Sequence, residues 1–274
     1  MSSWSATWVR FLFGLPFALL YLITVTWSDP TGLPDIHGMF LFWCAATAAT
    51  QIGATVLLVH LFSLRNFAIG TSYARTEAFM TALVGFSLFG EVLDLAGWIA
   101  IIISVAGVVI ISIARQGVSG WALVRSVFNR AAGIGLLSGL LFAFASLCLR
   151  QGSLSLGHPN FLVAASSTLV TVILIQTVCL GVFILWTRRA ELKAIATTWK
   201  ACWFVGLTSA IGSAGWFTAM TIERAAYVKA LGQIEFVFAI AVSTLIFKEK
   251  STPRELFGMC LVAAGIVVLL LYAD

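Results

Sequence analysis

The chain has 274 residues, of which 61% are hydrophobic and only 10% are charged. Soluble domains are roughly 45–50% apolar and about 25% charged, so this composition excludes a water-soluble enzyme or binding domain and indicates an integral membrane protein. The net charge of +5 does not predict a nucleic-acid partner, because the basic residues stand singly or in small groups between apolar runs, where membrane topology signals lie.

Nine apolar runs are long enough to cross a bilayer, since a hydrocarbon core of about 30 Å needs roughly 20 apolar residues per helix. The first run is too long for a secretory signal peptide and has no small-residue cleavage site after it, so we interpret it as a span. The sequence therefore predicts an all-α, polytopic membrane helix bundle. The predicted spans are 8–27, 38–61, 68–90, 95–114, 131–150, 160–187, 199–219, 226–247 and 254–272.

Nothing in the sequence indicates catalysis or a cofactor. Hydrolase, zinc-protease and phosphate-loop motifs are missing, and the three histidines are far apart in the sequence. The five cysteines all lie inside apolar runs, without the spacing of a metal or redox site. We therefore predict a protein that is not an enzyme, with no catalytic residue, no metal site and no cofactor.

An internal repeat is the most informative feature. Residues 44–109 align without a gap onto residues 202–267. Glutamate is rare in the chain, yet two glutamates of the first copy, Glu77 and Glu91, fall on Glu235 and Glu249 of the second. Matches of this kind in one ungapped register predict a duplication.

Each copy ends in the same pattern: a helix closing on a glutamate, a short turn, and a last helix with small residues at fixed offsets. Glu91 is followed by Ala100 and Gly107, and Glu249 is followed by Gly258 and Gly265. This pattern resembles the EamA-type domain of the drug/metabolite transporter superfamily, over nearly the whole chain. The resemblance implies two repeats, at 1–115 and 131–272, that form inverted helix bundles with a substrate cavity between them and work by alternating access.

The resemblance also exposes a difference. The family has ten helices, five in each repeat, whereas nine are predicted here, four in the first repeat and five in the second. The first family helix therefore has no counterpart in this sequence. A misplaced start codon, a truncation and a true nine-helix variant are all compatible with that observation.

Charged residues at mid-membrane depth mark the candidate site, because burying a charge in the bilayer costs several kcal/mol unless it is paired or hydrated. Under the repeat, Glu77 and Glu235 are equivalent, as are Arg75 and Gln233, and Thr71 and Lys229. Two readings stay open: these residues line a polar cavity, or they form interhelical salt bridges that fix the packing. The candidate substrate- or ion-binding residues are Arg75, Glu77, Lys229, Gln233, Glu235, Thr71, Tyr73 and Gln51.

In the cavity reading, Arg75 or Lys229 holds an anionic group such as a carboxylate, while Glu77 or Glu235 holds an amine or carries the coupling proton. We therefore expect a secondary-active transporter, and specifically an exporter of small metabolites such as amino-acid-like compounds. The alternatives are a non-transporting remnant or binding subunit, and a lipid-carrier flippase.

Basic residues fall mainly on one side of the predicted topology, which places the N-terminus in the cytoplasm and the C-terminus outside. We expect a multi-pass protein of the cell (inner) membrane whose partners are the lipid bilayer and a small-molecule substrate. Monomer and homodimer stay open. The residues counted on the cytoplasmic side are Arg10, Arg65, Arg115, Arg125, Arg130, Arg188, Arg189, Lys193, Lys200, Lys248, Lys250 and Arg254, against Arg150 and Arg224 opposite.

Overall fold

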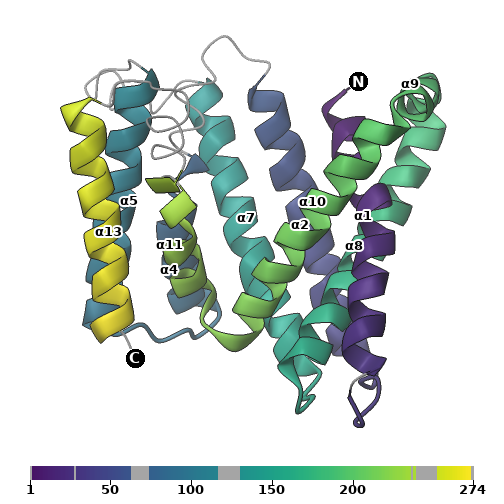
Figure 1. Ribbon diagram of the computed structural model, residues 1–274, viewed down its shortest axis with the longest axis horizontal. Helices are drawn as coiled ribbons and strands as arrows, with labels where there is room; N and C mark the ends of the chain where they lie inside the picture. Colours follow the sequence, from purple (N-terminus) through teal and green to yellow (C-terminus); the bar gives the residue numbers. More distant parts are fainter. Residues whose placement is uncertain are drawn as a thin grey trace. The chain divides into compact units, whose positions relative to one another are not determined.

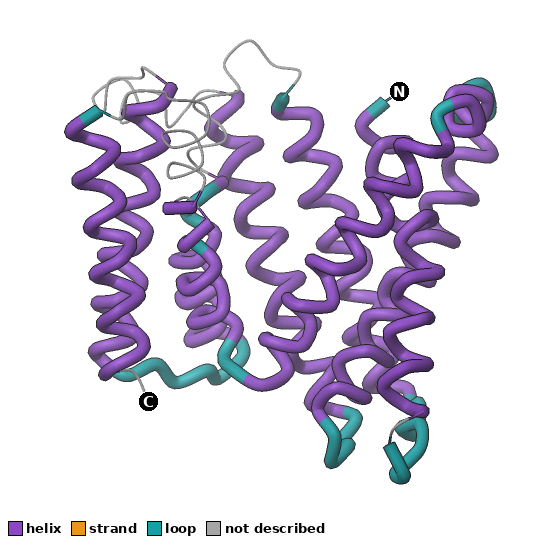
Figure 2. The backbone as a smooth tube through the Cα atoms, viewed as in Figure 1, coloured by secondary structure: helices purple, strands orange, loops and turns teal. Residues whose placement is uncertain are grey.

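The computed structural model describes residues 2–27, 29–62, 74–116, 130–235, 237–238 and 252–272. Within those ranges every regular element is an α-helix (Figures 1 and 2), which confirms the all-α prediction. Helices suit a bilayer because they satisfy all their backbone hydrogen bonds within one segment. The helices are α1 Ser3–Trp27, α2 Gly38–Leu61, α4 Glu77–Leu88, α5 Leu95–Gln116, α7 Arg130–Ser155, α8 Phe161–Thr187, α9 Glu191–Thr197, α10 Trp199–Ile222, α11 Ala225–Gly232 and α13 Pro253–Tyr272.

Six of the described helices are long and apolar enough to cross a membrane, namely α1, α2, α5, α7, α8 and α13. The predicted span 199–219 is present as α10, 24 residues long, but is not among the six because its apolar run is diluted by glycine, serine and threonine. The predicted spans 68–90 and 226–247 lie partly outside the described residues. The short helix α9 falls where a break between spans was expected.

The chain forms two compact units, and each unit draws on both sequence repeats. Unit 1 comprises residues 1–56 and 145–223, and unit 2 comprises residues 57–144 and 224–274. The boundary falls inside α2, inside α7 and between α10 and α11. Compactness in space therefore does not follow the order of the repeats along the chain.

In unit 2, α5 and α13 pack closely along much of their length (Figure 1). A Cβ atom added to Gly107 of α5 would lie 2.7 Å from the carbonyl oxygen of Gly258, and one added to Gly265 would lie 2.7 Å from the carbonyl oxygen of Ala100. The repeat carries the first contact onto the second, since Gly107 is equivalent to Gly265 and Ala100 to Gly258. As α5 runs from 100 to 107, α13 runs from 265 to 258, so these equivalent helices are antiparallel.

The same two helices begin with side-chain caps at equivalent positions. Asp94 precedes α5, and its Oδ1 accepts from the Gly97 N–H at 2.9 Å. Its counterpart Thr252 precedes α13; the Glu255 N–H donates to the Thr252 Oγ1 at 3.3 Å, and the Thr252 N–H donates to the Glu255 carboxylate at 2.7 Å. That reciprocal pair is a capping box, so both repeats start their last helix at one register with different chemistry.

In unit 1, α1 packs antiparallel against α8. The indole Nε1–H of Trp8 donates to the Thr177 carbonyl oxygen at 2.9 Å, and the Trp4 ring lies 4.9 Å from the Phe183 ring between centroids. Residue numbers thus fall along one helix as they rise along the other. Helices α1 and α8 occupy corresponding places in the two repeats, so an inverted relation holds in this unit as well.

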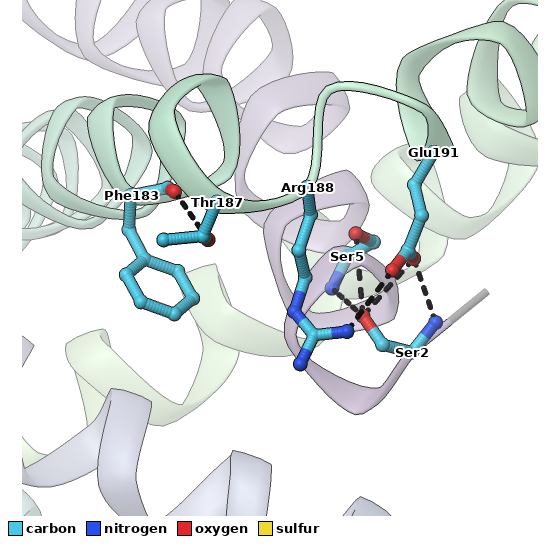
Figure 3. A network of polar contacts seen from close by, with 6 residues as sticks. All are labelled: Ser2, Ser5, Phe183, Thr187, Arg188 and Glu191. Atoms are coloured by element: carbon cyan, nitrogen blue, oxygen red, sulfur yellow. Dashed lines mark hydrogen bonds and ion pairs between the residues drawn. The ribbon is translucent and has the colours of Figure 1, made fainter.

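The corner between α8 and α9 anchors the start of α1 (Figure 3). The Glu191 carboxylate accepts from the Ser2 N–H at 2.7 Å, from the Ser2 hydroxyl at 3.0 Å and from the Arg188 guanidinium at 3.3 Å. These donors stabilise the charged form, the Ser2 N–H most of all, and lower the pKa of Glu191 to about 2. The N-terminal end of α1 and the basic α8–α9 corner therefore lie at the same end of unit 1.

Candidate substrate site

An ion pair between the two repeats forms the centre of the candidate site in unit 2. Glu77 is the first residue of α4, and Lys229 lies in the second half of α11, which packs against α4. The Lys229 ammonium binds the Glu77 carboxylate, with the side chains 16% and 23% exposed respectively. A largely buried pair of this kind is held by its partners, because either charge left alone would be costly to bury.

Helix α7 supplies the surface beneath this pair. The Lys229 ammonium lies 5.9 Å from the Phe142 ring centroid, where a cation is attracted to the electron-rich face of an aromatic ring. Three residues earlier, a Cβ atom on Gly139 would lie 3.1 Å from the Ala74 carbonyl oxygen. Glycine at 139 therefore lets the turn that leads into α4 approach α7 closely.

Two further charged residues of the candidate set, Arg75 and Glu235, are also described in unit 2. Arg75 is in the turn before α4, and the Glu235 carboxylate lies near enough to attract its guanidinium. Gln233, one turn after Lys229, is only 7% exposed, and its side-chain oxygen accepts no hydrogen bond from the described residues. The candidate residues from this unit thus include two cations, two carboxylates and one amide.

The pairing crosses between the repeats. Glu77 of the first repeat pairs with Lys229 of the second, and Glu235 of the second attracts Arg75 of the first. The carboxylate of Glu77 is thus neutralised by a cation of the other repeat, and its equivalent Glu235 is within electrostatic reach of one. The four charges sum to zero and include both signs; Glu77 and Lys229 are mostly buried, whereas Glu235 is exposed.

The site prediction also named residues elsewhere. Thr71 and Tyr73 lie outside the described residues. Gln51 lies in unit 1, where its side-chain oxygen accepts from the Gln176 amide at 2.8 Å; Gln176 is completely buried. The structure therefore brings Arg75, Glu77, Lys229, Gln233 and Glu235 together in unit 2, and it pairs Gln51 with a different helix in unit 1.

Sequence reasoning missed one polar contact of unit 2. The Tyr227 hydroxyl donates to the Asp94 Oδ1 at 2.6 Å, and the Arg224 guanidinium lies 5.4 Å from the Tyr227 ring centroid. The hydrogen bond from Tyr227 is the largest effect on the pKa of Asp94 and lowers it. Burial acts in the opposite direction and is smaller. An aspartate three residues before Gly97 was a signal for a helix cap, but nothing in the sequence linked it to Tyr227.

The chain is similar to one known protein family in sequence and to solved structures in fold. The model of the EamA-like transporter family matches residues 129–271, which are 143 of the 274 residues. No protein of curated function matches the sequence. Among solved structures, a chain described only as "Crystal structure of protein" has a TM-score of 0.66 at 15% identity and covers 99% of this chain and 87% of its own. That likeness supports the fold alone.

Proposed function

Since the chain belongs to the EamA-like transporter family, and is therefore a multi-pass membrane transporter of the drug/metabolite type, we propose that it is a secondary-active exporter of small amino-acid-like metabolites in the cell membrane. The observation that carries this proposal is the mostly buried ion pair between Glu77 and Lys229, with Arg75 within electrostatic reach of Glu235. A zwitterion carries both charges that such a set recognises.

Recognition follows from exchange of partners. An incoming ammonium group replaces the Lys229 ammonium at Glu77, and the incoming carboxylate takes the released Lys229. One charge pair becomes two, Glu77 with the ammonium and Lys229 with the carboxylate, so the substrate enters without leaving a buried charge alone. A ligand with one charge cannot do this, because one member of the pair then stays uncompensated.

Alternating access in this proposal moves unit 1 against unit 2, since these are the compact bodies of the structure. The ion pair lies wholly within unit 2, so it travels with one body. In this scheme substrate binding competes with the internal pair, and release restores it.

The test is exchange transport by the full chain in proteoliposomes. Vesicles loaded with unlabelled amino acids are given labelled zwitterions, labelled amines without a carboxylate, or labelled carboxylates without an amine. We expect exchange of zwitterions only, and a loss of at least tenfold in E77Q and in K229Q. The control D35N neutralises an exposed carboxylate in the loop between α1 and α2 and should exchange at the wild-type rate. Absence of zwitterion exchange, or full rates in both site variants, would refute the proposal.

A further inference from the structure

Arg10 is a charged residue in a membrane helix that the proposed transport site does not use. It follows the first residue of α1, Ser3, by seven positions, or roughly 10 Å along the helix axis. Its Nε–H donates to the Oγ of Ser209 on α10, and its guanidinium carbon lies 5.8 Å from the Phe11 ring centroid. A cation at such depth is expensive and usually serves a ligand, a pore or a partner.

No described carboxylate compensates this cation. In the described part of unit 1 the acids are Asp29, Asp35, Glu191 and Glu223, and all of them lie in loops or at helix ends. Asp29 binds Thr31 and Asn160, and Glu191 binds Ser2 and Arg188. Arg10 therefore has a neutral hydroxyl as its hydrogen-bond partner, which leaves its charge unbalanced within the described residues.

The side chain of Arg10 runs into the helix bundle and not toward the nearer membrane surface. A Cβ atom on Gly14, one turn after Arg10, would meet the Gly206 carbonyl oxygen at 3.5 Å and the Ala210 side chain at 3.9 Å. Ser209 lies between those two α10 residues, so the Arg10 Nε reaches the level of Gly14. Helical side chains lean toward the N-terminus by default, and a surface-seeking arginine would follow that direction. Arg10 does the opposite.

The Ser209 hydroxyl is available as a donor. Neighbouring hydroxyls donate back to their own helix: Thr208 to the Phe204 carbonyl at 2.9 Å and Thr7 to the Ser3 carbonyl at 2.8 Å. Ser209 accepts from Arg10 and makes no such backbone bond among the described residues. Its O–H and the two terminal NH₂ groups of Arg10 therefore form a compact set of donors without an acceptor.

We propose that Arg10 and Ser209 form a binding site in unit 1 for a single anionic oxygen group, a carboxylate or a phosphate. The guanidinium holds two of the anion's oxygens in the two-pronged geometry that arginine favours, and the Ser209 hydroxyl adds a third hydrogen bond. The anion supplies the negative charge that Arg10 lacks. This inference does not depend on the transport proposal, because its test measures binding.

The test uses the full chain in nanodiscs of phosphatidylcholine alone, with benzoate and inorganic phosphate as probes and the shift of the unfolding temperature as readout. We expect R10Q to weaken anion binding at least tenfold and S209A to weaken it about fivefold, the effect of one hydrogen bond. R10K keeps the charge without the fork and should fall between wild type and R10Q. The control R189Q removes an exposed arginine that binds the Leu185 carbonyl, and it should bind as wild type does.

A lipid arm distinguishes the source of the anion. Phosphatidylglycerol added to the nanodiscs is followed by native mass spectrometry. If wild type retains this lipid, R10Q releases it and benzoate does not displace it, the occupant is a headgroup; if benzoate displaces it, a soluble carboxylate is the occupant. Both results support the site. Equal anion affinity in wild type, R10K and R10Q, or no stabilisation by any of the three anions, would overturn it.

Discussion

Gly107 and Gly258 lie against each other where α5 meets α13: a Cβ atom on Gly107 would come within 2.7 Å of the Gly258 carbonyl oxygen, and one on Gly258 within 2.8 Å of the Gly107 carbonyl oxygen. Contacts this short are found only where neither residue has a side chain. Around them Val108, Ile111, Val262 and Ile266 form a buried apolar cluster. The helix pair is therefore held by backbone approach, with large side chains packed on either side.

Alanine at position 107 should accordingly destabilise the protein. The added methyl group must push α13 away, and overpacking of a tight contact costs roughly 1–3 kcal/mol. We expect G107A to lower the unfolding temperature in detergent by several degrees. In the control G215A the new methyl group meets no atom within 4 Å, so the temperature should stay within a degree of wild type. Equal behaviour of the two variants would show that the close contact is unimportant.

A charge swap separates the structural and functional roles of Glu77 and Lys229. Removing one partner, as in E77Q, leaves a mostly buried charge alone and should cost about 2 kcal/mol, below the usual 3–5 for fully buried pairs. The double variant E77K/K229E restores the attraction and should recover most of that stability. Exchange transport should stay at least tenfold below wild type, because the substrate's amine and carboxylate then meet reversed charges. Recovery of both properties would assign the pair to packing alone.

Proton coupling can be assigned to one of the equivalent acids. Glu77 is bound to Lys229, whereas Glu235 is the more exposed carboxylate. We expect E235Q to abolish transport driven by a pH gradient while leaving exchange at equal pH within about twofold of wild type. E77Q should reduce both. A pH-driven rate in E235Q equal to that of wild type would exclude Glu235 as the proton carrier.

The Tyr227–Asp94 contact should give stability that depends on pH. The folded state holds the pKa of Asp94 below its ordinary value of 3.8, mainly through the Tyr227 hydroxyl. A lowered pKa means that the contribution is complete above about pH 4 and disappears as the pH falls through the folded value. Y227F should therefore lose about 1 kcal/mol at pH 7, and its difference from wild type should shrink below pH 4.

Y21F is the matched control for that prediction. The Tyr21 hydroxyl is 2.9 Å from the neutral hydroxyl of Thr218, so its loss should cost the same at every pH between 3 and 7. Thermal unfolding over that range measures both variants. A constant difference from wild type for Y227F would show that Asp94 does not gain stability from the tyrosine.

Hydropathy and the duplication were enough to predict the class of fold and most helix positions. Apolar runs of membrane length have few alternatives in a bilayer, so the predicted 38–61 became α2 with the same bounds. The short helix α9, Glu191–Thr197, was not predicted, because seven residues rich in charge carry no apolar run. Its first residue, Glu191, binds Ser2, which lies 189 positions away in the sequence.

The sequence selected the candidate residues but did not predict which of them contact each other, and their role in binding stays a prediction. The position of Arg75, Glu77, Lys229 and Glu235 inside apolar runs selected them, because a charge within the membrane is costly unless it is paired or hydrated. The repeat relates equivalent positions and says nothing about which cation faces which acid. That choice depends on the packing of α4 against α11 and on Gly139 and Phe142 of α7, which no local pattern reveals.

Arg10 is a residue whose surroundings could not be predicted from the sequence. Counted by sequence, it belongs with the basic residues that mark the cytoplasmic end of the first span, at the start of the predicted 8–27, and that topology stays a prediction. The structure includes it in α1, which begins at Ser3, and turns it toward Ser209 of α10. Because α1 starts five residues before the predicted span, Arg10 lies seven positions after its first residue, where it binds Ser209 of α10.

The positions of the charged residues in the two copies bear on the direction of transport. Glu77 and Glu235 stand at equivalent positions of the predicted repeat, but Arg75 stands where the other copy has Gln233, and Lys229 where it has Thr71. A carrier made of two identical inverted halves would look the same from either side of the bilayer and would run equally well both ways. Here the negative charges obey that symmetry and the positive charges break it. If the two repeats face opposite sides of the membrane, as the proposal has it, the cations therefore make those two sides electrically different.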